Sequence, residues 1–502
     1  MIPSSLVAIA LLTPLVAAGP CDIYASGGTP CVAAHSTTRA LFTAFSGALY
    51  QVQRGSDNAT TNIAPVRAGG VANSATQDTF CARTTCLITT IFDQTGRGNH
   101  LTKAPPGGAA SGTDPGGFDN LAAADGAPVT LNGAKAYGVF IPPGTGYRNN
   151  APSGTAVGDA AEGIYAVLDG QHSNNQCCFD YGNAETNTQD TGNGHMEVLS
   201  TLGIWEPPGP GLGHGLPLIS RTARIFGATA RGVNPNSPTI TSRFVTAVVK
   251  GQPGNWAVRG GNSASGALST FFNGARPTDG YNPMKKEGAI LLGVGGDNSN
   301  WGQGTFYEGV MTTGFPSDAT ENAVQADIVA ARYAATSLTT GPAITVGSAV
   351  SLRATTACCT TSYLSHSGST VSIQTVTSAS TAAAKLAASW HVVAGLSATA
   401  AANGCVSFEA RDAAGSFLRH SGFRLLLNAN DGTKLFAEDA TWCPQTTKAG
   451  GTNSVRSWGF PAHYFRHFTG SVFAAANGGP NAWDTKTTFN DDASWAVEAA
   501  WA

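Results

Sequence analysis

Charged side chains are scarce in this chain: they make up 12% of its 502 residues, and the formal net charge is -3. A chain with so little charge is a poor partner for nucleic acid or for an acidic membrane surface. We therefore expect neither partner. The length is sufficient for two or three domains with their own cores.

Several short catalytic and metal-binding motifs are also missing. The sequence contains no CxxC pair, no HExxH, no G-x-S-x-G and no phosphate-binding loop. These absences leave little support for a zinc site, a serine hydrolase or a metalloenzyme. Nothing in the sequence requires a metal or an organic cofactor, and we expect none.

A long apolar run occurs only at the start of the chain. Residues 1–18, "MIPSSLVAIALLTPLVAA", are uncharged and end in small residues, which predicts a secretory signal peptide cut after Ala18. The alternative is a transmembrane anchor, which would need about 20 apolar residues, whereas Pro14 interrupts this run. We expect a secreted, extracellular monomer.

The ten cysteines of a secreted chain should mostly be paired. They fall in couples, so that five bridges are possible: Cys21 with Cys31, Cys81 with Cys86, Cys177 beside Cys178, Cys358 beside Cys359, and Cys405 with Cys443 further apart. Asn58, in "NAT", is the only N-glycosylation sequon, and we expect it on a surface loop.

Short apolar segments bounded by Gly, Asn, Asp and Pro run from about residue 19 to 316, for example "RFVTAVVKG", "GAILLGVGG" and "TFYEGVM". This spacing predicts an all-β sandwich. Residues 317–335 then predict one amphipathic helix, in which Asp318 and Glu321 resemble a capping box. The first domain therefore spans 19–335, and the Thr/Gly/Pro-rich residues 336–349 read as a linker.

An internal repeat follows in residues 350–502. "YLSH" (363–366), "FLRH" (417–420) and "YFRH" (464–467) are three copies of one motif, and each is followed by a second one, "AASW" (387–390), "DATW" (439–442) and "DASW" (492–495). Three strand-rich units that cannot each bury their own face predict a three-fold closed structure, a β-trefoil.

The His and Asp of each unit can meet the hydroxyls of a sugar in a shallow pocket, while a ring such as Phe423 covers an apolar sugar face. The alternative is that both are structural turn residues. For the tryptophan of each unit we favour the structural role, since a trefoil core needs bulk there. The first unit has Ala387 where the others have Asp, so only the second and third pockets should bind well.

A candidate catalytic acid lies in "GVGGDNSN" (293–300), where an apolar strand ends in two glycines and Asp297. Glycines allow close approach of a ligand, and an acid at a strand end suits general acid catalysis. A plain Asp-Asn turn is the alternative. Cys177 and Cys178, if bonded to each other, would offer a flat apolar platform beneath a sugar ring; separate bridges to other cysteines are the alternative.

Taken together, "CDIYASGGTPCVAAHSTTRALF", "QDTFCARTTCLI", "QCCFDYGNAET", "FVTAVVKG", "GARPTDGYNPM", "LLGVGGDNSN" and "NANDGTK" resemble the fungal α-L-arabinofuranosidase B family. This is glycoside hydrolase family 54 with a C-terminal arabinose-binding module of family 42. The resemblance extends over residues 19–502. It implies a β-sandwich catalytic domain, a β-trefoil binding domain, and retaining, exo-acting hydrolysis of terminal α-L-arabinofuranosyl residues on arabinoxylan or arabinan.

The resemblance also implies roles for individual residues. Asp297 matches the acid/base, Gly296 a substrate contact, and Cys177 with Cys178 the vicinal disulfide at the subsite. In the trefoil, one sugar pocket is matched by His420, Phe423 and Asp439, and another by His467 and Asp492. Cys405 and Cys443 match the module's bridge, which leaves Cys358 and Cys359 outside the expected pattern.

The family's nucleophile does not appear where it should. It lies in an Asp-x-Glu-Asn motif some 25 residues after "GHME", here residues 194–197. Counting on reaches "SRTA" (220–223), so Ser220 stands at the aspartate position and Thr222 at the glutamate position. A threonine without an adjacent base is a poor nucleophile, and retaining hydrolysis needs two carboxylates about 5–5.5 Å apart.

Three explanations remain open: a binding-only relative, substitution by another acid such as Glu206 or Glu197, or a stretch out of frame between about 200 and 228. Codons exist for residues 221–225 (CGG ACT GCG AGA ATC) that spell Asp-Cys-Glu-Asn when read two bases later. An out-of-frame stretch would also explain four prolines within residues 207–217, where a buried strand is expected.

Overall fold

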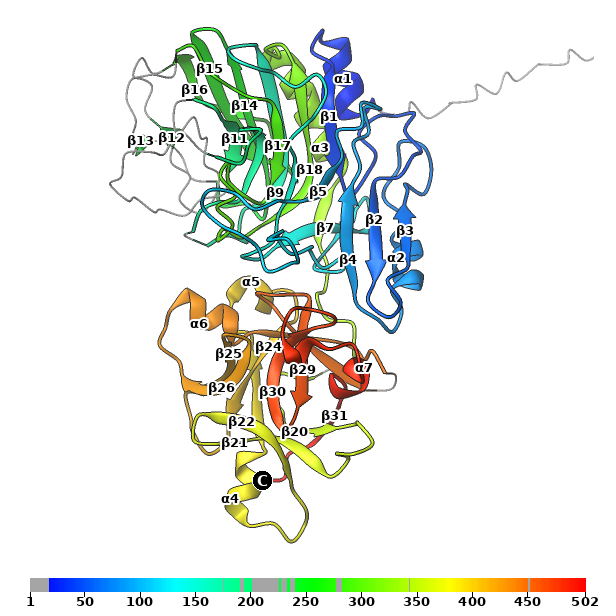
Figure 1. Cartoon of the computed structure of the whole chain (residues 1–502), viewed down its shortest axis with the longest axis vertical. Coiled ribbons are helices and arrows are strands. Elements are labelled where there is room, and N and C mark those ends of the chain that lie inside the picture. The colour runs from blue at the N-terminus through cyan, green and yellow to red at the C-terminus, as the bar shows by residue number, and fades with distance from the viewer. Residues whose placement is uncertain are drawn as a thin grey trace, which may run out of the picture.

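The computed structural model describes residues 18–174, 176–189, 194–200, 225–226, 233–234, 240–276, 282–342, 344–449 and 452–502. The chain is mostly β, as predicted, with 12% of it helical. Figure 1 shows two parts, an N-terminal part (18–335) and a C-terminal part (350–502). Within the described residues, no helix has the length and apolar character needed to span a membrane.

The first sheet of the N-terminal part has nine antiparallel strands in the order β16-β15-β14-β9-β18-β7-β6-β19, with β1 paired to β18. Their bounds are β1 (Cys31–Ser36), β6 (Ala127–Leu131), β7 (Ala134–Ile141), β9 (Glu162–Asp169), β14 (Phe244–Gln252), β15 (Asn255–Asn262), β16 (Ser269–Ala275), β18 (Gly304–Thr313) and β19 (Tyr333–Ala335).

The second sheet has eight strands in the order β11-β10-β17-β8-β5-β4-β2-β3. Their bounds are β2 (Tyr50–Arg54), β3 (Thr60–Ile63), β4 (Cys86–Ile91), β5 (Leu101–Lys103), β8 (Tyr147–Asn149), β10 (Asp180–Ala184), β11 (Glu197–Ser200) and β17 (Ala289–Leu292). Two further short strands, β12 (Ile225–Phe226) and β13 (Val233–Asn234), pair with each other. The strands predicted at "RFVTAVVKG", "GAILLGVGG" and "TFYEGVM" are β14, β17 and β18.

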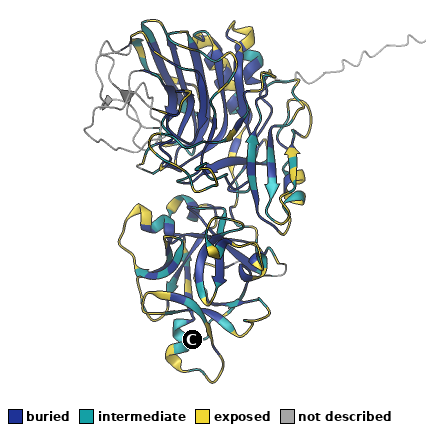
Figure 2. Ribbon diagram, viewed as in Figure 1, coloured by how far each residue is buried: buried dark blue, intermediate teal, exposed yellow. Residues whose placement is uncertain are grey.

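The two sheets share one hydrophobic core, to which β2 and β4 contribute from one sheet and β9 and β14 from the other. Along β9, Ile164 points into this core, whereas the next residue, Tyr165, packs in a second core on the opposite face. Helices cover that face, which explains why β9 and β14 are continuous apolar runs rather than alternating ones. Figure 2 shows both strands buried along nearly their whole length.

The helices of the N-terminal part are α1 (Pro20–Ser26), α2 (Ser74–Phe80) and α3 (Asp318–Ala330). Helix α3 confirms that a helix forms within the predicted range 317–335, but it ends at Ala330, and Tyr333–Ala335 form strand β19 because they pair with β6. The predicted cap is also wrong. Ser317 is the N-cap, and its hydroxyl accepts the amide of Thr320 at 3.1 Å, whereas Asp318 pairs with Lys250 at 2.6 Å. Serine is well suited to this position because its short side chain reaches an unpaired amide of the first turn.

Six strands of the C-terminal part form a closed ring, β20-β23-β24-β27-β28-β31, in which β31 pairs back to β20. Three hairpins, β21–β22, β25–β26 and β29–β30, meet through pairings among β22, β26 and β30. The strand bounds are β20 (Ala349–Ala354), β21 (Ser362–Ser367), β22 (Thr370–Thr375), β23 (Trp390–Ala394), β24 (Val406–Ala410), β25 (Ser416–Ser421), β26 (Arg424–Ala429), β27 (Trp442–Thr446), β28 (Asn453–Ser457), β29 (His463–Phe468), β30 (Ser471–Ala476) and β31 (Trp495–Ala499).

Short helices complete the three repeated units: α4 (Ala382–Ala387), α5 (Ala398–Ala401), α6 (Lys434–Asp439), η1 (Ala482–Asp484) and α7 (Phe489–Asp492). Trp390, Trp442 and Trp495 follow α4, α6 and α7, and all three are fully buried in one core. Each indole N–H donates to a carbonyl of its own unit's first hairpin strand, at 3.0–3.1 Å. The structural role predicted for the tryptophans is confirmed.

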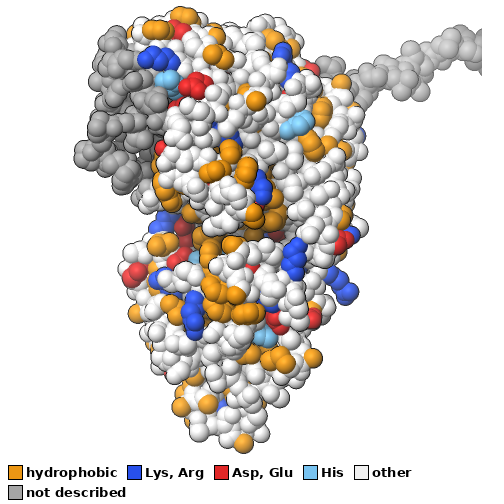
Figure 3. Space-filling view, in the orientation of Figure 1, with side chains coloured by type: hydrophobic (Ala, Val, Ile, Leu, Met, Phe, Trp, Pro, Cys, Tyr) orange, Lys and Arg blue, Asp and Glu red, His pale blue; other side chains and the backbone are white. Residues whose placement is uncertain are grey.

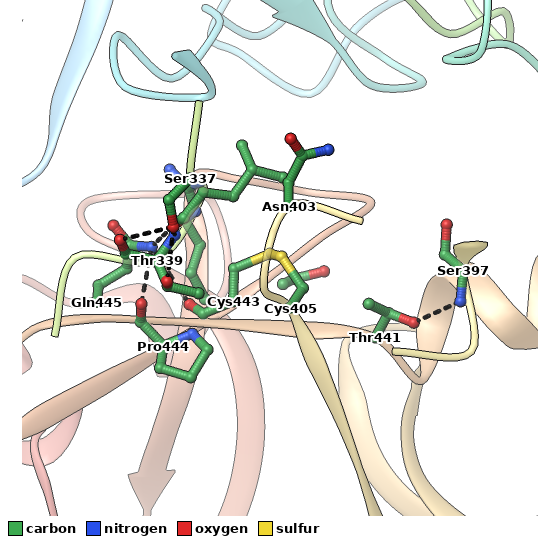
Figure 4. The surroundings of a disulfide bond; sticks show 12 residues. Ser337, Thr339, Ser397, Asn403, Cys405, Thr441, Cys443, Pro444 and Gln445 are labelled. Carbon is green, nitrogen blue, oxygen red and sulfur yellow. Dashed lines mark hydrogen bonds between the residues drawn. A yellow bond between two sulfur atoms is a disulfide. The ribbon is translucent and has the colours of Figure 1, made fainter. Parts of the chain in front are cut away.

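The segment between the two parts packs against the C-terminal part. Leu338 is buried beside the Cys405–Cys443 disulfide, and the amide of Thr340 donates to the carbonyl of Pro444 at 3.1 Å. Figure 4 shows Ser337 and Thr339 of this segment near the same disulfide. The parts also touch directly, because the rings of Phe140 and Trp458 lie 5.2 Å apart. On the face shown in Figure 3, apolar side chains gather where the two parts meet.

Candidate active site and sugar pockets

Asp297 lies in a tight loop that begins where β17 ends. Gly293 has a φ of 82° and Asn298 a φ of 63°, so the backbone turns back on itself, and the amide of Gly295 donates to the carbonyl of Ser299 at 2.9 Å. The Asp297 carboxylate is half-buried and accepts the amide of Ser299 at 3.0 Å. The backbone here is an Asp-Asn turn, as the alternative interpretation holds. The turn nevertheless leaves the Asp297 carboxylate partly accessible.

Arg148 of β8 binds the backbone of this loop. Its guanidinium is buried and donates to the carbonyls of Gly295 at 3.2 Å and Gly296 at 2.7 Å, and also to the carbonyl of Glu185. Burial lowers the pKa of Arg148 to about 10, although Glu185 and Asp297 oppose the shift. The side chain remains a cation at neutral pH, beneath the loop that presents Asp297.

A side chain at Gly296 would require the buried side chains beneath it to move. A Cβ added there would lie 1.9 Å from Glu185 Oε2 and 2.7 Å from Met196 Sδ. Glycine thus allows the loop to lie directly on the side chains of two neighbouring segments. The structure therefore places the predicted substrate contact Gly296 beside a buried carboxylate.

Cys177 and Cys178 are bonded to each other, so the alternative of separate bridges is wrong. The disulfide lies against the Asp297 loop: the hydroxyl of Ser299 donates to Cys178 Sγ at 3.3 Å, and the amide of Trp301 donates to the carbonyl of Cys177 at 3.0 Å. Trp301 is about half exposed, at 48%. Four features lie together here: the disulfide, Gly296, Asp297 and an exposed indole.

All ten cysteines are paired, which excludes them as zinc ligands. The remaining bonds join Cys21 to Cys31, Cys81 to Cys86, Cys358 to Cys359, and Cys405 to Cys443. Among the described residues, no group of three or more His, Cys, Asp or Glu side chains is arranged to hold a metal ion.

Two buried carboxylates near Asp297 escaped the sequence analysis. Burial raises the pKa of Asp180 to about 7, and the nearby charge of Asp297 adds to this shift. Glu185 lies under Gly296. Both belong to "CCFDYGNAE", directly after the vicinal cysteines. Their closeness in sequence to Cys177 and Cys178 could have marked them as candidate site residues.

Glu197 does not share this environment. It is buried in an ion cluster, 2.9 Å from Lys286 and 3.3 Å from Arg276. Burial opposes ionisation of Glu197, but the two cations outweigh it and lower its pKa. A Cβ on Gly251 of β14 would lie 2.2 Å from its Oε1. Ser220, Thr222 and Glu206 lie outside the described residues.

The second repeated unit brings its predicted pocket residues together. His420 Nε2 lies 3.5 Å from Asp439 Oδ1, and the rings of His420 and Phe423 are 5.8 Å apart. One neighbour was missed: the ring of His463 stacks on Phe423 at 4.4 Å. Burial lowers the pKa of His420 to about 3 and raises that of Asp439 to about 7.

The third unit brings His467 and Asp492 together in the same way, with Nε2 and Oδ1 3.7 Å apart. In the first unit, where Ala387 replaces the acid, His366 Nε2 lies 2.8 Å from Asp412 Oδ1. That acid comes from the second unit, a position that the repeat pattern did not indicate.

Asn58 is exposed in the turn after β2, and its Oδ1 accepts a hydrogen bond from Lys486 Nζ at 2.6 Å. The amide nitrogen of Asn58, the atom that carries an N-linked glycan, takes no part in this hydrogen bond. The surface position expected for Asn58 is confirmed.

Two family models match the chain: "Alpha-L-arabinofuranosidase B, catalytic" over residues 20–334 and "Alpha-L-arabinofuranosidase B (ABFB) domain" over residues 352–497. A probable α-L-arabinofuranosidase B of Aspergillus clavatus is 63% identical over 492 residues, which are 97% of this chain and 96% of the relative. An α-L-arabinofuranosidase of Hypocrea jecorina is 64% identical, with 97% of each chain covered.

Solved structures of arabinofuranosidases also match the chain. A glutamate-to-glutamine mutant of a glycoside hydrolase family 54 α-L-arabinofuranosidase, soaked with 4-nitrophenyl α-L-arabinofuranoside, matches with a TM-score of 0.90 and 56% identity, and the match covers 96% of this chain and 100% of that one. An arabinofuranosidase complexed with arabinofuranosyl-α-1,2-xylobiose matches with a TM-score of 0.89 and 56% identity, covering 96% and 99%.

Proposed function

Because the chain belongs to the α-L-arabinofuranosidase B family of glycoside hydrolases, we propose that it is built to release terminal α-L-arabinofuranosyl side chains from arabinoxylan and arabinan. The action is exo and retaining. Residues 19–335 form a β-sandwich catalytic domain, 336–349 a linker, and 350–502 a β-trefoil that binds arabinose. The shared core of the two sheets and the six-strand ring with its three hairpins support these assignments.

The observation that carries the proposal is the fixed loop of Asp297 beside the vicinal disulfide. Asp297 is the acid/base: it protonates the leaving glycosidic oxygen, and its carboxylate then takes a proton from the attacking water. The Cys177–Cys178 disulfide supports the apolar face of the furanose ring, and Gly296 lets the loop lie directly on Glu185 and Met196, which positions its backbone as a sugar contact. Arg148, bonded to the carbonyl of Gly296 at 2.7 Å, fixes this geometry.

The second carboxylate is what this sequence lacks. Thr222 stands at the nucleophile's position and Ser220 at that of the neighbouring aspartate. Glu197 is a poor substitute, because Lys286 and Arg276 already pair with it. We propose that the gene between residues 195 and 235 encodes Asp-Cys-Glu-Asn in another frame. Codons that cannot yield this motif in any frame would exclude the explanation.

The alternative function is an arabinofuranose-binding protein with little or no hydrolysis. An assay of this chain, as written, on an aryl α-L-arabinofuranoside separates the two. We expect feeble or no turnover from the sequence with Thr222, and recovery when the acidic motif is restored at 220–223. Normal turnover with Thr222 in place would refute the assigned nucleophile position.

The working protein is a secreted, glycosylated monomer without a cofactor, and its partners are arabinofuranosyl-substituted cell-wall polysaccharides. Residues 1–18 are its signal peptide and Asn58 carries its glycan. Amino-terminal sequencing of the secreted chain should begin at Gly19, and enzymatic deglycosylation should shift its mass unless Asn58 is replaced by Gln. Gel filtration should give the mass of one chain.

A further inference from the structure

The three His–Asp pockets of the C-terminal part are completed by a loop from the next repeated unit. Each loop follows the unit's first strand: 355–361 after β20, 411–415 after β24 and 458–462 after β28. Asp412 contacts His366 of the first pocket, Phe460 contacts His420 of the second, and Thr356 contacts His467 of the third. The third pocket can be completed by the first unit because the ring of strands is closed: β31 of the third unit pairs back to β20 of the first.

The residue supplied to each pocket differs in chemistry. The first pocket receives the carboxylate of Asp412, which is hydrogen-bonded to His366 Nε2 at 2.8 Å. The second receives the ring of Phe460, whose centroid lies 5.4 Å from that of His420 and which cannot pair with the imidazole as an acceptor. The third receives a hydroxyl. The three loops therefore leave the three pockets in different states of hydrogen bonding.

In the third pocket the hydroxyl of Thr356 lies between His467 and Asp492. It donates to Asp492 Oδ1 at 3.0 Å and accepts from His467 Nε2 at 2.9 Å. The other carboxylate oxygen of Asp492 accepts from Arg466 at 3.0 Å and Thr488 at 2.7 Å. A sugar hydroxyl would use this same donor–acceptor pair, so Thr356 takes the place of a ligand group.

The loop that carries Thr356 is held in place. Thr355 donates through its hydroxyl to the carbonyl of Ser494 at 2.9 Å, and the amide of Cys359 donates to the carbonyl of Thr356 at 2.8 Å. The Cys358–Cys359 disulfide, outside the pattern expected from the family, belongs to this loop. The hydroxyl is thus presented by an anchored segment.

Among the described residues of the second pocket, no hydroxyl bridges His420 and Asp439. Nε2 of His420 is buried, and no described residue gives it a hydrogen-bond partner. Asp439 lies 3.5 Å from it, and Arg419 lies 3.4 Å from the other oxygen of Asp439. A buried polar atom without a partner is costly, and a hydroxyl bridging His420 and Asp439, as Thr356 bridges the third pair, would remove that cost.

We propose that the second pocket, His420 with Asp439, is the tight site for a terminal furanosyl residue, and that the Thr356 hydroxyl competes with the sugar in the third pocket and weakens it. The inference rests on the proposed arabinose-binding role of the C-terminal part. It predicts unequal sites where the repeat alone predicts two pockets that both bind well, and it makes Thr356 the residue that sets the difference.

The test is calorimetric titration of the full chain with methyl α-L-arabinofuranoside, using D439N, D492N, T356V and, as a control that keeps the hydroxyl, T356S. The D439N/D492N double variant gives the contribution of the N-terminal part, which all variants share. D439N should remove the tight site and D492N should leave it. T356V should tighten the weak site about three- to tenfold, the equivalent of one net hydrogen bond, and T356S should not.

Adding D492N to T356V should cancel the gain, which shows that the third pocket produced it. Equal losses in D439N and D492N, or weaker binding in T356V, would overturn the ranking while leaving the binding role intact. Binding at neither pocket in the unaltered chain would overturn both the ranking and the proposed role. Unchanged melting temperatures establish that each variant folds.

Discussion

Arg148 donates a hydrogen bond to the carbonyl of Gly296 at 2.7 Å and so joins β8 to the loop that presents Asp297. The same guanidinium reaches Gly295 and Glu185. A backbone loop with three glycines, Gly293, Gly295 and Gly296, has little stiffness of its own. One buried cation bound by three carbonyl groups contributes to its position, together with Asp119, which accepts hydrogen bonds from Asn298 and Asn300.

Replacing Arg148 by Lys should therefore destabilise the N-terminal part. One ammonium cannot reproduce the planar fork that reaches three carbonyls, and the loss of hydrogen bonds to a charged group costs about 2–4 kcal/mol. Urea denaturation measures the change. Arg54→Lys is the matched control, because Arg54 is only partly buried and pairs with Asp57 near the surface. An R148K chain as stable as the control would contradict the anchoring role.

Replacing Gly296 by Ala should displace the Asp297 loop. The added Cβ would lie 1.9 Å from Glu185 Oε2, inside any allowed contact. We expect a lower melting temperature and weaker binding of arabinofuranosides. Gly459→Ala is the control, since a Cβ there meets nothing within 4 Å. If the two alanine variants melt alike, Gly296 is not packed as described.

The β-rich architecture could be predicted because short apolar segments and turn residues are local signals. The three-fold repeat could be predicted for the same reason, since "YLSH", "FLRH" and "YFRH" are visible in the sequence. The sugar-binding roles predicted for His420, Asp439, His467 and Asp492 came from that repeat and from the family resemblance. Their proximity in pairs needed only the packing of each unit's own hairpin and helix.

What the sequence could not indicate are contacts between distant segments. Arg148 lies far from Gly296 in the sequence, and Thr356 far from His467 and Asp492. No periodicity marks such pairs, because the closure of the sheets and of the ring brings them together. The cap of α3 was misassigned for a local reason: Ser317 and Asp318 are both good caps, and the choice depended on Lys250 of β14 taking Asp318.

The N-terminal part should lose stability as the pH rises from about 4 to about 7. Burial raises the pKa of Asp180 to about 7 and that of Asp119 to about 6. Burial also raises the pKa of Glu162, where Lys286 opposes the shift and Glu197 adds to it. Each folded-state pKa is above the unfolded value, so the folded chain holds more protons in this range and deprotonation favours unfolding.

The variant Asp180→Asn should flatten this dependence, because the amide is neutral at every pH. Between pH 4.5 and 7.5 the unaltered chain should lose about 2–4 kcal/mol more free energy of unfolding than D180N. Urea denaturation at the two pH values measures this difference. Parallel pH profiles for the two proteins would show that Asp180 does not titrate as its burial implies.

Binding at the second pocket should weaken as the pH falls through about 7. Burial raises the pKa of Asp439 to about 7; Arg419 opposes this shift, while Glu438 and Asp431 add to it. The pKa of His420, lowered to about 3, keeps that ring neutral throughout. A protonated Asp439 accepts hydrogen bonds from sugar hydroxyls less well than the carboxylate does.

Titration of the full chain with methyl α-L-arabinofuranoside at pH 5, 6, 7 and 8 measures this dependence, and D492N isolates the second pocket once the contribution of the N-terminal part, measured in the D439N/D492N double variant at each pH, is subtracted. In D439N the dependence of this pocket should vanish, together with most of its affinity. The third pocket, in which Asp492 pairs with Arg466 at 3.0 Å, is the weak site that remains in D439N. An affinity of the D492N chain that is constant from pH 5 to 8 would contradict the role of the Asp439 carboxylate as the acceptor for the sugar.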